Sequence, residues 1–177
     1  MKKCIIIAIA LLAIGYGSAS AQAVWGGRIG LSRPTVSSEG YSVNGKFGVE
    51  LGPVLYYTLK ENFYLNSGAM FSLKAFDFGD ESLNMYYMDI PLYAGYSIPV
   101  NKLSLYAQAG PFMGIKLAES EESGLKNFNA GLGIMAGINL KRFKVELGYQ
   151  AGLLNVVDDA DFSARLSSLF IGVSYVF

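Results

Sequence analysis

A two-residue alternation of side-chain polarity dominates the sequence and is clearest at residues 169–177. Because successive side chains of a β-strand point to opposite faces, the odd-numbered residues of this segment would share one face. That face is wholly apolar and ends in the rings of Tyr175 and Phe177. Such a strand suits a position where one face meets lipid and its end meets a headgroup layer. The pattern restricts the chain to folds in which strands present a continuous apolar face.

The same alternation recurs along the chain, and it predicts eight strands. We expect them at residues 24–31, 47–57, 63–74, 87–98, 103–117, 128–138, 143–153 and 169–177. Short turns near residues 60, 100 and 140 alternate with four longer loops, at 33–45, 76–84, 118–126 and 155–164. This spacing is typical of successive antiparallel hairpins with short turns at one end. It predicts an all-β fold, an eight-stranded antiparallel up-and-down barrel.

Charged residues separate cleanly between the two faces of the expected strands. The outward faces carry none, whereas the opposite faces carry Arg28, Glu50, Lys74, Asp89, Lys116, Lys144 and Glu146. A soluble barrel would show the reverse, with a polar exterior around an apolar cavity. Lys or Arg at the midplane of a bilayer costs ~2 to 4 kcal/mol, which explains their exclusion from a lipid-facing surface. The distribution therefore predicts a transmembrane β-barrel with its charges in the lumen.

The first residues are typical of a secretory signal peptide. A basic start precedes an apolar run over residues 4–14, and residues 19–21 (Ala-Ser-Ala) have the small-x-small form of a cleavage site. The apolar run is shorter than the ~20 residues of a spanning helix, which argues against a membrane anchor. We expect residues 1–21 to be removed and residues 22–177 to form one barrel domain.

The composition argues against several classes of function. Beyond residue 21 there is neither cysteine nor histidine, and 12 basic residues (14 less Lys2 and Lys3) face 14 acidic ones. Thiolate ligands and the commonest general base are therefore missing, and no nucleic-acid partner is expected. The acidic residues at 121–122 and 158–161 lack the glycine-spaced pattern of a calcium loop. We expect no enzyme activity, cofactor or metal.

The last expected strand also carries a motif. Gly172, Tyr175 and Phe177 match the Gly-x-x-aromatic-x-aromatic ending that is typical of proteins delivered to the bacterial barrel-assembly machinery. We expect these three residues to serve as an assembly signal.

Residues 88–96, Met-Asp-Ile-Pro-Leu-Tyr-Ala-Gly-Tyr, resemble the acidic-Ile-Pro-Leu segment of a known group. This group is the small outer-membrane β-barrel family of Bacteroidetes, the PorT-like or OmpX/OmpA-like barrels called porin family proteins. The resemblance implies a location in the outer membrane of a Gram-negative bacterium, reached through the periplasm, in contact with outer-membrane lipid. PorT itself belongs to a gliding and protein-secretion system.

An eight-stranded barrel is only wide enough for its own side chains or one small ligand. Because buried charges must be paired or hydrated, we expect an interior polar network that plugs the lumen. Its expected members are Arg28, Glu50, Asp89, Lys144 and Glu146. The predicted protein is a non-enzymatic, monomeric outer-membrane barrel whose extracellular loops mediate binding or envelope integrity. The alternatives are a narrow porin-like channel for small solutes and a component of a protein-secretion system.

Overall fold

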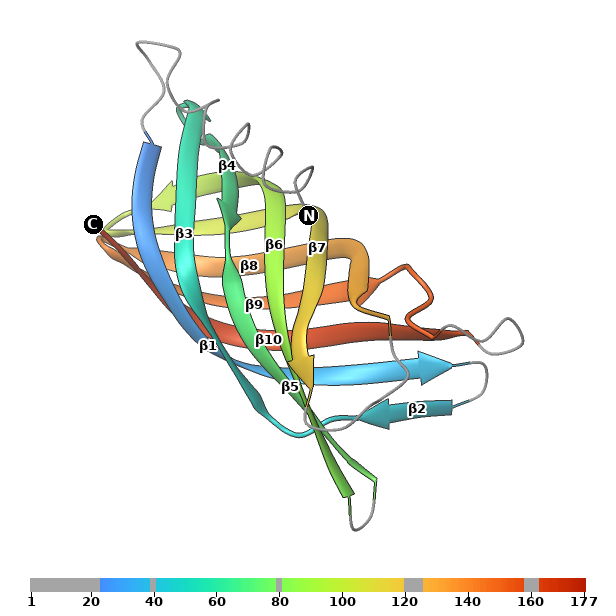
Figure 1. Cartoon of the computed structure of the whole chain (residues 1–177). Coiled ribbons are helices and arrows are strands. Elements are labelled where there is room, and N and C mark those ends of the chain that lie inside the picture. The colour runs from blue at the N-terminus through green and yellow to red at the C-terminus, as the bar shows by residue number, and fades with distance from the viewer. Residues whose placement is uncertain (1–22, 39–40, 79–80, 120–125, 158–162) are drawn as a thin grey trace.

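The chain forms one antiparallel sheet that closes on itself (Figure 1). The computed structural model describes residues 23–38, 41–78, 81–119, 126–157 and 163–177. The strands are β1 (Ala23–Ser38), β2 (Tyr41–Asn44), β3 (Gly48–Lys60), β4 (Phe63–Gly68), β5 (Met70–Phe78), β6 (Glu81–Val100), β7 (Leu103–Glu119), β8 (Phe128–Leu140), β9 (Phe143–Gly152) and β10 (Ala164–Val176). Strand β1 pairs with β10 on one side and with β3 on the other, which closes the barrel.

Strands β4 and β5 together fill one position of the ring. Both pair with β3 on one side and with β6 on the other. Ala69 separates them, and its N–H donates to the Pro53 carbonyl at 3.1 Å. Pro53 and Pro91 lack an N–H for the ladder, which accounts for the irregularity at this point. Because β2 pairs only with the end of β1, the ring holds eight strands, and the predicted fold class is confirmed.

Two-residue turns connect β3 to β4, β6 to β7 and β8 to β9. The first turn residue has a positive φ in each case, at Glu61 (31°), Asn101 (54°) and Lys141 (58°). Left-handed backbone at a two-residue turn matches the twist of the flanking strands. The three predicted short turns are confirmed, and they share one end of the barrel, called the turn end below.

The opposite end, called the loop end, differs from the expectation at two of the four loops. Strand β1 continues to Ser38 and pairs with β2, so most of the expected loop 33–45 is a hairpin. Strands β5 and β6 likewise pair as far as Phe78 and Glu81, within the expected loop 76–84. Both hairpins extend from the barrel in Figure 1. Their sequences lack the apolar alternation because strands beyond the bilayer need no lipid-facing side.

Side-chain burial alternates along the strands as predicted. Ile134 of β8 is 63% exposed, whereas its neighbour Met135 is 1% exposed. The core lies inside the ring, and the outer surface is apolar. Among the described residues there is no helix with the length and hydrophobicity needed to cross a membrane. The expected signal peptide, residues 1–21, lies outside the described residues.

Candidate functional site in the barrel interior

Glu146 of β9 is the centre of a buried polar cluster. Its carboxylate forms an ion pair with Arg28 of β1 and accepts hydrogen bonds from the hydroxyls of Tyr106 (2.6 Å) and Ser174 (3.0 Å). Only 1% of Glu146 is exposed. Three donors around one carboxylate compensate for its lost hydration, because charge-assisted hydrogen bonds are stronger than neutral ones.

Side chains around Arg28 fill the middle of the lumen. The guanidinium lies 5.7 Å from the centroid of the Phe170 ring, and its Nη2 lies 3.6 Å from the Met135 sulfur. Gln108 donates from Nε2 to the same sulfur at 2.7 Å. Side chains from β1, β7, β8 and β10 thus pack together inside the ring, and Arg28 is held on more than one side.

Lys144 of β9 lies one inward position closer to the turn end than Glu146. Its ammonium is 3.8 Å from the ring centroid of Tyr56, 4.5 Å from that of Tyr106 and 5.1 Å from that of Tyr64. The rings also meet edge to face, with centroids 6.1 Å apart for Tyr56 and Tyr64. Among the described residues no carboxylate lies within ion-pair distance of Lys144. Ring faces attract the cation in place of a carboxylate.

A second polar cluster surrounds Asp89 of β6. Ser72 donates to Asp89 Oδ2 at 2.7 Å, and the Lys74 ammonium lies 3.1 Å from Oδ2 and 3.3 Å from Oδ1. The same ammonium lies 4.4 Å from the centroid of the Tyr87 ring. Nearer the loop end, Lys116 forms an ion pair with Glu119 at 2.8 Å.

The structure places all five expected network residues inside the ring but divides them. Arg28, Lys144 and Glu146 lie together, whereas Asp89 pairs with Lys74, which the expected network did not include. Glu50 is buried, and its Oε1 has no hydrogen-bond partner among the described residues. Sequence reasoning also missed Ser72, Tyr106 and Ser174 as partners. The sequence places these three residues on the inward faces of their strands. That position indicates that they are buried but does not identify their hydrogen-bond partners.

Aromatic rings packed against glycines of other strands make up much of the interior wall. A Cβ at Gly95 would lie 2.6 Å from the Tyr64 hydroxyl, and one at Gly137 would lie 2.7 Å from that of Tyr106. A Cβ at Gly148 would overlap the Phe170 ring and lie 2.7 Å from its Cε1. Glycine at these positions leaves space for a ring to lie flat against the strand.

An apolar cluster lies at the loop end of the barrel interior. Val156, from the connection between β9 and β10, is fully buried against Phe76, Met85, Tyr87 and Leu166. Its N–H donates to the Ala164 carbonyl at 2.8 Å, and its own carbonyl accepts from Lys126 at 2.6 Å. These two hydrogen bonds hold the β9–β10 connection against the start of β10 and against the segment that precedes β8.

The residues of the expected assembly signal lie on both faces of β10. Gly172 points inward, whereas Tyr175 points outward at the turn end. The Tyr175 ring packs edge to face with Phe143 (5.1 Å between centroids) and with Phe177 (5.6 Å). This outward group of rings has the position of an interfacial aromatic girdle. The role of Gly172, Tyr175 and Phe177 in assembly stays a prediction.

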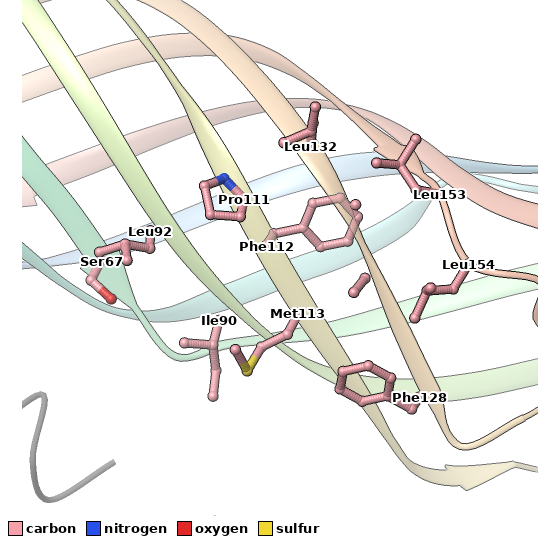
Figure 2. A pocket seen from close by; sticks show the side chains of 12 residues that line it. Ser67, Ile90, Leu92, Pro111, Phe112, Met113, Phe128, Leu132, Leu153 and Leu154 are labelled. Atoms are coloured by element: carbon pink, nitrogen blue, oxygen red, sulfur yellow. The ribbon is translucent and has the colours of Figure 1, made fainter. Parts of the chain in front are cut away.

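The outer surface contains an apolar hollow of about 440 Å³, shown in Figure 2. Leu92, Pro111, Met113 and Leu132 are among its lining residues. Ser67 also lines it, and its hydroxyl donates to the Pro91 carbonyl at 2.9 Å. Because that hydroxyl is satisfied by the protein, the hollow presents an apolar lining to lipid.

Metal-binding side chains do not converge within the described part of the chain, where no group of three or more Cys, His, Asp or Glu side chains could hold an ion. The acidic residues at 121–122 and 158–161 lie outside the described residues.

A closed eight-stranded ring with an apolar exterior and a charged, packed interior defines an integral membrane β-barrel. Residues 18–158, more than half of the chain, match the model of the outer membrane protein beta-barrel domain family. The chain belongs to this family, and its location is the outer membrane.

Solved structures of outer-membrane proteins share the fold. Neisserial surface protein A (NspA) is 14% identical, with a TM-score of 0.57, over 88% of this chain and 99% of that chain. OprG from Pseudomonas aeruginosa is 12% identical, with a TM-score of 0.51, over 89% of this chain and 95% of that chain. A search of curated protein sequences found no match. Similarity at these identities establishes the architecture alone.

Proposed function

We propose that the protein is a non-enzymatic outer-membrane barrel with a largely plugged lumen, whose extracellular loops mediate binding or envelope integrity. The observation that carries this proposal is the arrangement around Glu146. Its carboxylate joins β9 to Arg28 of β1, Tyr106 of β7 and Ser174 of β10, so one group ties four strands together across the lumen. A polar network with its partners in place stabilises a closed interior.

The loop end supports a role in binding. Short turns lie on the periplasmic side of bacterial barrels, which assigns the loop end to the cell exterior. There the β1–β2 hairpin leaves all four β2 side chains exposed, including Tyr41, which is 83% exposed. Exposed aromatic and apolar side chains on a hairpin are typical of protein contact surfaces.

We further infer that the chain belongs to the PorT-like or OmpX/OmpA-like barrels of Bacteroidetes. The support is the sequence of residues 88–96, within which Asp89 lies in the lumen and pairs with Lys74. The same proposal includes a cleaved signal peptide at residues 1–21, delivery to the barrel-assembly machinery and a monomer surrounded by outer-membrane lipid.

The second candidate is a narrow channel for small solutes. Charged side chains of both signs along the lumen favour it, because a pore lined by fixed charges selects ions. A third candidate, membership of a protein-secretion system, is supported by the resemblance to PorT.

The loop proposal can be tested by complementation of a deletion strain. Wild-type protein should restore resistance to vancomycin, whereas Tyr41→Ser combined with Val43→Ser should not, at equal amounts of folded barrel. Ser42→Ala on the same strand is the matched control and should complement fully. Full complementation by the double variant, or no permeability defect in the deletion strain, would contradict a role of this hairpin in envelope integrity.

A further inference from the structure

A second hollow, of about 240 Å³, lies at the turn end of the lumen. Its lining includes Thr58, Asn62, Ser97 and Asn139, which supply hydroxyl and amide groups, together with the charged residues Lys144 and Glu61. Asn62 belongs to the turn between β3 and β4, so the hollow is adjacent to the periplasmic mouth. Polar groups from β3, β6, β8 and β9 thus converge on one space beneath the Glu146 cluster.

Lys144 brings a positive charge to this hollow, and no carboxylate of the described residues, Glu61 of the same lining included, lies within ion-pair distance of it. It is only 9% exposed, and three tyrosine rings surround its ammonium. Ring faces stabilise the charge but do not neutralise it. The nearby Glu146 carboxylate already bonds Arg28, Tyr106 and Ser174. A buried cation in this setting is stabilised further by an anion that reaches it through the hollow.

Asn139 supplies a second, independent observation. It is the direct cross-strand neighbour of Lys144 in the β8–β9 ladder, and both residues line the hollow. The side-chain oxygen of Asn139 is buried and has no hydrogen-bond partner among the described residues. Leaving a buried acceptor unsatisfied is unfavourable, so a ligand that donates to this oxygen is favoured.

The Lys144 ammonium and the Asn139 amide oxygen together are complementary to a ligand that has negative oxygen atoms and one hydroxyl donor. We propose that the hollow is a binding site for a compact protonated oxyanion of the periplasm, with hydrogen phosphate as its simplest form. Anionic oxygens accept from Lys144, and the phosphate hydroxyl donates to Asn139 Oδ1. The site lies outside the plugged section of the lumen, so it requires no conduction through the barrel.

The probe experiment compares phosphate with sulfate on the refolded full-length barrel in detergent micelles. Sulfate has the same shape and negative charge but no hydroxyl at neutral pH. Amide shifts of Asn62, Ser97 and Asn139 are followed by NMR at constant ionic strength. Phosphate should produce saturable shifts and bind at least tenfold more tightly than sulfate. No saturable shift with phosphate, or equal affinity for the two anions, would overturn the proposal.

Two variants test the roles of Lys144 and Asn139 separately. Lys144→Met should weaken phosphate and sulfate binding at least tenfold, whereas Lys116→Met, at the loop-end ion pair, should leave both unchanged. Asn139→Ala should weaken phosphate at least fivefold and sulfate little. Unaltered phosphate binding in Lys144→Met, or equal losses of both anions in Asn139→Ala, would contradict the assignment.

A further variant covers the case in which Lys144→Met does not fold. Thr58→Glu keeps Lys144 and adds a second carboxylate to the hollow that Glu61 already lines, where it would occupy the anion position. Loss of phosphate binding in this variant supports the site, and retention of wild-type affinity overturns it.

Discussion

Glu146 and Arg28 form an ion pair inside the barrel from two strands that are separated only by β10. Ser174 lies on β10 between them and donates to the same carboxylate. The pair therefore joins the last strands of the ring to the first, where β1 and β10 close the barrel. Breaking this ion pair should destabilise the pairing that closes the ring as well as the polar cluster in the interior.

Glu146→Gln should lower the free energy of unfolding by about 3 kcal/mol, because it leaves the buried Arg28 without its counter-ion. Urea unfolding in lipid vesicles, followed by fluorescence of Trp25, the single tryptophan, measures the change. The control is Glu119→Gln, whose partner is Lys116 and whose side chain is partly exposed. It should cost less than Glu146→Gln, because water reaches the partly exposed Glu119 side of this pair. Equal losses in the two variants would argue against a central role of the Glu146 cluster.

Gly95→Ala should destabilise the barrel by about 1 to 3 kcal/mol, because its Cβ would overlap the ring of Tyr64. Gly27→Ala is the matched control, since nothing lies within 4 Å of a Cβ at that outward position. The same urea titration should show little change for Gly27→Ala. A neutral effect of Gly95→Ala would show that the ring is free to move away from the strand.

Leu132→Arg should reduce insertion into the outer membrane while secretion into the periplasm continues. Leu132 is an exposed, outward residue of β8, and a midplane Arg costs ~2 to 4 kcal/mol. Leu59→Arg, beside the β3–β4 turn, is the control, with a cost of about 0 to 1 kcal/mol near the interface. Heat-modifiable gel migration of membrane fractions reports the folded yield. A normal yield of Leu132→Arg would place that face away from lipid.

Phe177→Ala should slow assembly in cells several-fold, because it removes an aromatic residue of the proposed assembly signal. Phe47→Ala removes a ring of equal exposure at the loop end (73%, against 74% for Phe177) and should assemble at the wild-type rate. Pulse-chase labelling with the heat-modifiable band as readout measures both rates. Assembly of Phe177→Ala at the wild-type rate would refute the signal and leave the strand unaffected.

The fold could be predicted from the sequence because the lipid-facing side sets the phase of every strand. A shift of one residue would place Arg28 or Glu146 in the bilayer, so the alternation determines which residues face inward. The limits of β1 and β6 could not be predicted in the same way. Beyond the bilayer these strands continue to pair through backbone hydrogen bonds. Such bonds form with any side chain, so the polar sequence there does not indicate where the strands end.

Partner choice inside the barrel was less predictable than burial. Asp89 pairs with Lys74 of the neighbouring β5, whereas Glu146 reaches past β10 to Arg28. Which charges meet depends on the stagger of the strands and on the space that glycines leave between the rings. Neither quantity is encoded by the two-residue period of a single strand.

Conductance of the refolded barrel in planar lipid bilayers tests the central claim of a plugged lumen most directly. Wild-type protein should insert without stable ion-conducting steps, because in the proposed plugged barrel the Glu146 cluster and the apolar cluster around Val156 close the lumen at two levels. Arg28→Ala combined with Glu146→Ala should increase conductance if the variant remains folded by heat-modifiable migration. Stable, reproducible channels in the wild-type protein would contradict the plugged barrel and favour the narrow channel.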